Sequence, residues 1–110
     1  MVVYWRVFVD CKASASASSL SSKLFKLVSR TPTSVAVEPY HKGGHVITAT
    51  ITLVETSWPN CVLEALSLSQ KVARGWSITG NIEEELDAWS NESSVSGVTS
   101  VQVQLARASA

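Results

Sequence analysis

The sequence predicts an α+β fold in which two helices pack on one face of a mainly antiparallel sheet. Apolar and polar residues alternate along residues 2–11 and 98–107, as they do in half-buried strands. Between these stretches, apolar residues recur at helical spacing from Leu20 and again from Trp58. A chain of 110 residues is long enough for one hydrophobic core and too short for two. Residues 1–110 are therefore expected to form a single α+β domain.

The first strand is expected over residues 2–11, with its odd-numbered residues in the core and its even-numbered residues on the opposite face. The following helix is expected to begin near Leu20, with Ser18 or Ser19 as its N-cap. It should stop at Thr31–Thr33, because the proline there disfavours a helix. The run ASASASS before the helix is then a connector inside one domain rather than a linker between two.

Two further strands are expected at Ser34–Glu38 and His45–Glu55. The pair Gly43–Gly44 suits the turn between them, because glycine adopts positive φ readily. A second helix is expected to open at Ser57–Pro59, where proline is tolerated in the first turn, and to end at Gly75.

The last third of the chain returns to strand periodicity. Period two runs from Trp76 to Ala88, although the acidic run Glu83–Glu85 equally suits a short helix after Asn81. Residues 90–97 are turn-like, and Val98–Arg107 is expected to be the last strand. The resulting order is βαββαββ, and its first six elements resemble the ferredoxin-like βαββαβ plait, with an additional C-terminal strand. The resemblance implies two helices on one sheet face and leaves the other face uncovered.

The side chains expected on the uncovered face are mostly small or polar, as on a sheet face in contact with water. They are Tyr4, Arg6, Phe8, Glu38, Thr48, Thr50, Thr52, Gln102 and Gln104. Tyr4 and Phe8 invite comparison with RNA-recognition domains, which stack bases on sheet aromatics. However, the third strand carries threonines where those domains need aromatic and basic residues, and the net charge is zero. No nucleic-acid partner is therefore expected.

Signals for a membrane or for export are absent or incomplete. No apolar run approaches the ~20 residues needed to span a bilayer, so no membrane partner is expected. The opening residues imitate a secretory signal, but no basic residue precedes the apolar stretch and Arg6 interrupts it. We therefore expect an uncleaved chain with a cytoplasmic location.

Neither a metal nor another cofactor is expected. His41 and His45 flank a glycine turn, and no third ligand follows close by in the sequence. No GxGxxG or GxxxxGK pattern indicates a nucleotide. A homodimer could form by edge pairing, because the last strand is expected to offer unpaired backbone groups to a second copy.

The main local concentration of charge is acidic. On a strand, Glu83, Glu85 and Asp87 would share a face with Trp89. Such a ridge suits docking of a basic protein, because charge steers association and tryptophan is a frequent hot-spot residue. On an edge strand the same charges would simply discourage aggregation. No catalytic constellation accompanies them, so the sequence favours a small non-enzymatic binding protein. Immunity proteins that inhibit a basic toxin are similar in size and charge pattern.

An alternative site lies at the predicted edge between the first strand and the second helix. With the first and third strands expected to be parallel, Cys11 and Cys61 would meet at this edge, as a redox pair or as buried small hydrophobes. The site would comprise Asp10, Cys11, Lys12, Ser14, Ser16 and Cys61. It resembles the place where amino-acid-binding regulatory domains of this plait hold their effectors. The second hypothesis is therefore a ferredoxin-like protein that binds a small ligand or is catalytic.

Overall fold

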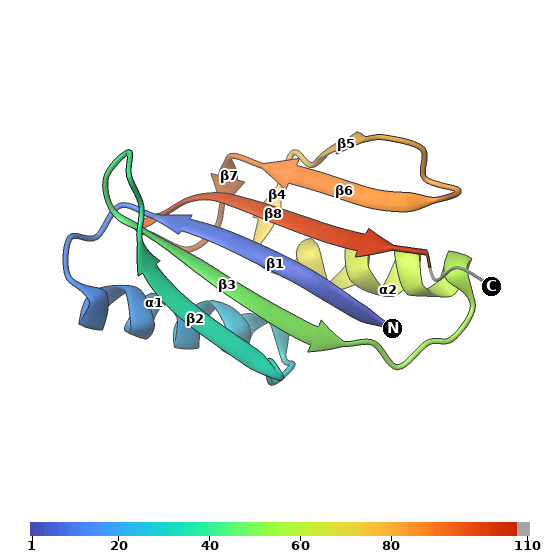
Figure 1. Cartoon of the computed structure of the whole chain (residues 1–110), viewed down its shortest axis with the longest axis horizontal. Coiled ribbons are helices and arrows are strands. Elements are labelled where there is room, and N and C mark those ends of the chain that lie inside the picture. Colours follow the sequence, from blue (N-terminus) through green and yellow to red (C-terminus); the bar gives the residue numbers. More distant parts are fainter. Residues whose placement is uncertain (108–110) are drawn as a thin grey trace.

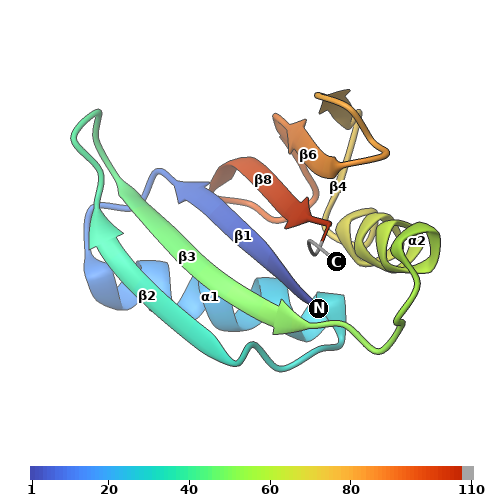
Figure 2. The same cartoon turned by 45° about the vertical axis from the view of Figure 1, so that its right-hand side comes forward.

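A six-stranded sheet whose neighbouring strands are all antiparallel carries two helices on one face (Figure 1 and Figure 2). The computed structural model describes residues 1–107. In spatial order the strands are β2 (Ser34–Pro39), β3 (His45–Thr52), β1 (Val2–Val9), β8 (Val98–Ala106), β6 (Glu85–Ser90) and β5 (Ser77–Thr79). The helices are α1 (Ser14–Val28) and α2 (Trp58–Ser69), and the short strands β4 (Ala73–Arg74) and β7 (Glu92–Ser93) form a separate pair. The predicted α+β fold with a mainly antiparallel sheet is confirmed.

The last strand, β8, lies inside the sheet between β1 and β6. In the expected plait, the strand directly after the second helix would lie beside β1, but here that segment forms β5 and β6 on the outer side of β8. β8 is the longest strand, and its inner-face residues Val101 and Val103 are fully buried. The expectation that the last strand is a free edge for a homodimer was therefore wrong. The sheet edges are β2 and β5.

Helix α1 begins at Ser14, so the ASASASS run forms its first turns and is not a connector. Ala17 and Ser21 are buried and extend the apolar stripe of the helix toward its N-terminus. Alanine has the highest helix propensity, and small side chains on the inner face let the helix lie close to the sheet. Ala13 is the N-cap residue and makes no side-chain hydrogen bond, so the expected serine cap lies inside the helix.

Helix α2 opens as expected but ends early. The Ser57 hydroxyl accepts a hydrogen bond from Asn60 N (3.4 Å) at its N-terminus, and the helix stops at Ser69, well before Gly75. Beyond it, the carbonyl oxygen of Val72 accepts a hydrogen bond from Ser94 N (2.9 Å), which holds the chain beside β7. Neither helix of the described residues is long and apolar enough to span a membrane.

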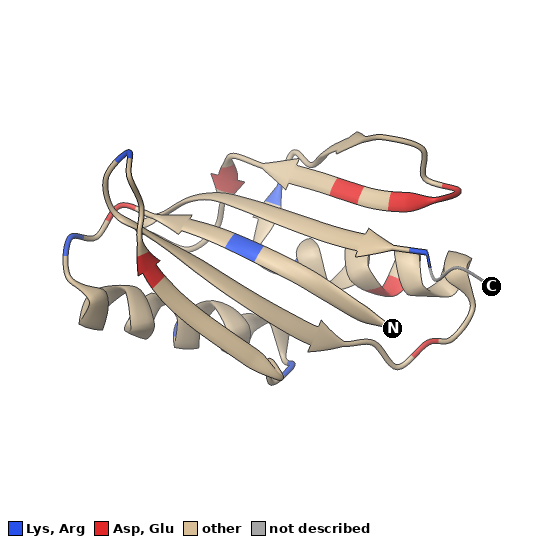
Figure 3. Cartoon of the chain, in the orientation of Figure 1, with Lys and Arg blue, Asp and Glu red and all other residues tan. Residues whose placement is uncertain are grey.

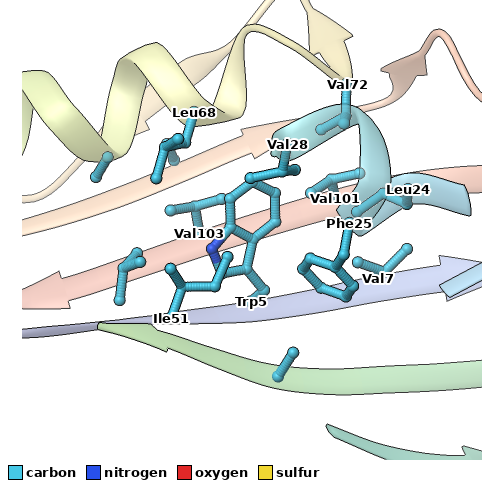
Figure 4. Packing of buried hydrophobic residues seen from close by; sticks show 14 of the residues in the cluster. Trp5, Val7, Leu24, Phe25, Val28, Ile51, Leu68, Val72, Val101 and Val103 are labelled. Atoms are coloured by element: carbon cyan, nitrogen blue, oxygen red, sulfur yellow. The ribbon is translucent and has the colours of Figure 1, made fainter. Parts of the chain in front are cut away.

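Trp5 lies at the centre of the core between the sheet and the two helices (Figure 4). Its ring meets Phe25 of α1 edge to face, with ring centroids 5.8 Å apart. Figure 4 shows Leu68 of α2 and Val103 of β8 around the same indole. The Trp5 Nε1 atom is buried without a hydrogen-bond partner in the described residues, which costs about 1–3 kcal/mol. Burial of so large an apolar ring offsets that cost.

Candidate functional site

The open face of the sheet, opposite the helices, carries the residues expected there. The strand register places Tyr4 between Thr50 and Gln104, and Arg6 between Thr48 and Gln102. These pairs lie on one face because directly opposite residues of antiparallel strands point to the same side. The alternation predicted from the sequence for β1, β3 and β8 is therefore confirmed.

Strand β6 adds an acidic edge to this open face. Leu86 and Ala88 are buried against the core, so Glu85, Asp87 and Trp89 point to the opposite side. In Figure 3, acidic residues follow one another along β6 and the turn before it, while the others are spread singly over the chain. Three of the four residues of the predicted acidic ridge therefore share the open face.

Glu83, the fourth residue of the predicted ridge, lies outside the strand. It belongs to the turn between β5 and β6, where Glu83 N donates to the Asn81 side-chain oxygen (3.1 Å). Its carbonyl oxygen accepts a hydrogen bond from the Arg107 guanidinium (3.0 Å). The period-two pattern therefore stops before this turn and resumes at β6, and neither a continuous strand nor a short α-helix over these residues is observed.

An aromatic row crosses the open face from β6 to the end of β2. The rings of Trp89 and Phe8 are tilted against each other with centroids 5.6 Å apart, and Phe8 meets Tyr40 edge to face at 5.1 Å. Trp89 Nε1 donates to the Asn91 side-chain oxygen (2.9 Å), which fixes the orientation of the indole. The guanidinium carbon of Arg6 lies 5.3 Å from the centre of the Phe8 ring, within cation–π range.

We call Glu85, Asp87, Trp89 and Phe8 the acidic-aromatic patch. Asp87 accepts a hydrogen bond from Gln102 Nε2 (3.2 Å), and Glu85 is exposed. Within the described part of the chain, neither carboxylate is paired with a basic side chain. Their negative charge is therefore available to a partner. The contact between Trp89 and Phe8 was not predicted from the sequence, because the contact depends on β8 lying between β6 and β1.

A groove of about 500 Å³ lies beside the β5–β6 turn on the helix side of the sheet. It is lined by Trp58, Pro59, Val62, Leu63, Ile82, Glu83 and Arg107. Leu63 and Ile82 expose much of their apolar side chains there. The Trp58 Nε1 donates to the Ile82 carbonyl oxygen (2.8 Å), which attaches the turn to α2.

The two cysteines do not meet, and the expectation that they share an edge was wrong. β1 runs antiparallel to β3, with Val9 opposite His45 and Val2 opposite Thr52. Cys11 follows one end of this ladder and Cys61 lies beyond the other, so roughly 20 Å of strand separates them.

Cys61 is fully buried, and its Sγ donates to the Glu55 carbonyl oxygen (3.2 Å). Burial raises the pKa of the Cys61 thiol. The N-terminal ammonium group opposes this effect, while the carboxylates of Glu64 and Glu55 add to it. A thiol with a raised pKa is a weak nucleophile at neutral pH, so Cys61 acts as a small core residue.

Two residues of the alternative site do line a hollow. Asp10 and Lys12 face a depression of about 460 Å³ that the β2–β3 hairpin closes with Tyr40, Lys42 and Gly44. The neighbouring serines of this predicted site, Ser14 and Ser16, are exposed in the first turn of α1 and do not line it. The six residues predicted as one ligand site are therefore dispersed, with Cys11 packed against the core instead of lining the hollow.

The histidines have structural roles. His45 is buried, and its Nδ1 donates to the Cys11 carbonyl oxygen (2.9 Å). The ring of His41 lies tilted against that of Tyr40, with ring centroids 4.6 Å apart. Among residues 1–107, no three His, Cys, Asp or Glu side chains are grouped so as to hold a metal ion.

Comparison with protein-family models, with curated proteins and with solved structures finds no match for this chain.

Proposed function

We propose that this chain is a non-enzymatic binding protein that recognises a basic protein through the acidic-aromatic patch. The observation that carries the proposal is the position of Trp89. Its ring is held by Phe8 and by a hydrogen bond to Asn91, beside two carboxylates that have no basic partner among residues 1–107. A tryptophan already fixed before binding loses little conformational entropy in a complex, and aromatic anchors of this kind dominate interface energetics.

The two carboxylates contribute more to the rate of association and to the choice of partner than to the affinity. Glu85 and Asp87 project from the same face of β6, and Glu83 and Glu84 extend the acidic region into the adjacent turn. Such a field accelerates encounter with a basic surface and disfavours acidic partners. The specific form of the proposal is an immunity-type inhibitor. A toxin that acts on nucleic acid needs a basic surface for phosphates, and an acidic patch can cover it.

The test compares two double charge reversals with equal changes in net charge. Glu85→Lys with Asp87→Lys reverses the patch, whereas Glu55→Lys with Glu92→Lys reverses two exposed carboxylates elsewhere. Titration calorimetry against the partner isolated from the protein's own source should show binding lost in the first variant and kept in the second. Equal affinities of the two variants would remove the patch from consideration.

A second candidate function rests on the hollow at the end of β1. In this reading, the strands β2-β3-β1-β8 with α1 and α2 form a ferredoxin-like plait into which residues 73–93 are inserted. Lys12 and Lys42 at the rim would attract a small anionic ligand. Native mass spectrometry of protein purified gently from its own source should then show a bound small molecule that a Lys12→Ala, Lys42→Ala variant loses.

A further inference from the structure

The two edges of the sheet differ in what they offer to another chain. β5 has only 3 residues, whereas β2 has 6 and pairs with β3 alone in the described structure. Figure 1 shows β2 as the outermost strand, with α1 lying behind it. β2 therefore presents the longer free row of backbone groups.

The hydrogen-bond pattern identifies which groups of β2 are free. Tyr40 N donates to Gly44 O (3.0 Å) at the hairpin, and bonded pairs alternate along an antiparallel ladder. The even-numbered residues of β2 therefore bond to β3. The ladder on the other side of β3 agrees, because there the odd-numbered residues of β3 bond to β1. The N–H and C=O groups of Val35 and Val37 consequently point away from the sheet.

The first four residues of this edge strand lack the usual protection against pairing. Natural edge strands carry lysines, inward-pointing charges or bulges, but residues 34–37 are uncharged and their register with β3 is regular. Prolines stand only at its ends, at Pro32 and Pro39. Because proline has no N–H, Pro39 ends the row of outward donors. The part of β2 that can pair with another strand is therefore short, with a proline near each end.

An apolar groove runs beside the same edge. It has a volume of about 270 Å³ and is lined by Ser18, Ser21, Ser22, Phe25, Pro32, Val35 and Val37. Val35 is 48% exposed, which leaves a large part of an apolar side chain in water. The serine side chains of α1 that line the groove are short and leave room above it. A strand added to β2 could therefore place its own side chains over Phe25 and Val35.

We propose that a second copy of this chain adds to this edge, with the two β2 strands antiparallel about a two-fold axis at Ala36. Val35 of each copy then lies opposite Val37 of the other, so the free backbone groups bond to each other. Opposite residues share a sheet face, so the valines of the second copy cover the groove. Glu38 lies opposite Ser34, which avoids a pair of facing carboxylates. The remaining edges are the short β5 strands, so the assembly closes as a dimer.

The register is tested by single cysteines, each introduced in a Cys11→Ser background. Ala36→Cys should form a disulfide-linked dimer on mild oxidation, because Ala36 faces its own copy at about 4.5 Å between Cα atoms. Glu38→Cys is the matched control on the same strand and face. Its two copies would lie roughly 13 Å apart, too far for a disulfide. Cross-linking of both variants to the same extent, or of neither, would overturn the proposed pairing.

The oligomeric state is tested separately by sedimentation equilibrium. The natural chain should be a dimer, and Val35→Lys should be a folded monomer by circular dichroism. Ile78→Lys is the control at the other sheet edge, where Ile78 is 46% exposed, and it should remain dimeric. A natural chain that stays monomeric at the highest soluble concentration would refute the proposal, and so would a dimer that survives Val35→Lys.

Discussion

Glu64 contacts three other residues through its carboxylate, and its replacement tests how the loop after β3 is held. Its carboxylate oxygens accept hydrogen bonds from Val54 N (3.0 Å) and Glu55 N (2.9 Å) in the loop before α2. The same carboxylate pairs with the Arg30 guanidinium (2.8 Å) after α1, and its side chain is 9% exposed. One side chain on α2 thus joins both helices to the end of β3.

The expected cost of Glu64→Gln follows from these contacts. Hydrogen bonds to a charged group contribute about 1.5–3 kcal/mol each, and glutamine keeps one neutral acceptor while losing the ion pair. The net loss in unfolding free energy should be about 2 kcal/mol, because the neutral amide still accepts one backbone N–H. For a chain of this length, that corresponds to a Tm lower by about 8 °C.

The same contacts predict a pH dependence. Burial alone would raise the pKa of Glu64, but the backbone N–H groups of Val54 and Glu55 and the Arg30 guanidinium outweigh burial and lower it. A lowered folded-state pKa stabilises the fold above the ordinary glutamate pKa, and the stabilisation is lost as the pH falls through the folded-state value. The stability difference between the natural chain and Glu64→Gln should therefore shrink in acid.

Urea denaturation followed by tryptophan fluorescence, from neutral to acidic pH, measures both effects. Glu84→Gln is the matched control, because Glu84 is exposed and lies in the turn before β6. It should leave the unfolding free energy unchanged within about 0.5 kcal/mol at neutral pH. A Glu64→Gln variant as stable as this control, or a stability difference that grows in acid, would show that the Glu64 carboxylate does not hold the loop.

Three further outcomes follow from single sites. Trp89→Ala should weaken binding of the protein partner about 30-fold in a calorimetric titration while the chain stays folded, because a hot-spot aromatic contributes about 2 kcal/mol. Gly44→Ala should lower the unfolding free energy in urea by at least about 1 kcal/mol more than Gly43→Ala. Both glycines have positive φ, but only at Gly44 would a Cβ collide with the backbone of β1. With a thiol reagent such as DTNB, Cys11 should react in the folded protein and Cys61 only on unfolding, because Cys61 is fully buried.

Local periodicity was enough to predict the faces of the strands. The assignments of Tyr4 and Arg6 to the open face, and of Glu85 and Asp87 to a face shared with Trp89, are confirmed by the register. Each depends only on alternation along one strand, which the sequence expresses directly. Three of the four residues of the acidic-aromatic patch were therefore predictable as a group, namely the side chains that β6 presents.

The arrangement of the strands was not predictable in the same way. Either β6 or β8 could pair with β1, and both are far from β1 in the sequence. Apolar and polar residues alternate in the same way along both strands, so the pattern does not show which of them lies beside β1. The contact between Trp89 and Phe8 depends on that outcome. The parallel pairing expected for β1 and β3 was wrong for another reason. Helix α1 returns the chain so that β2 runs in the direction of β1, and the β2–β3 hairpin then makes β3 antiparallel to β1, which separates Cys11 from Cys61.

The start of α1 was misjudged for a different reason. Alanine and serine carry little apolar signal, so the stretch from Ser14 resembles a loop in a hydrophobicity pattern. In the folded chain, Ala17 is fully buried and Ser21 is buried, so small residues continue the inner face of the helix that Leu24 belongs to. Helix propensity favours alanine, and that signal was present in the sequence.

The most direct test of the central claim is a parallel capture from the protein's own source. The natural chain and the Glu85→Lys, Asp87→Lys variant are each used as bait, and the retained molecules are identified by mass spectrometry. The natural chain should retain a protein rich in lysine and arginine that salt releases, and the variant should not. Retention of the same protein by both baits, or of a small molecule alone, would contradict it.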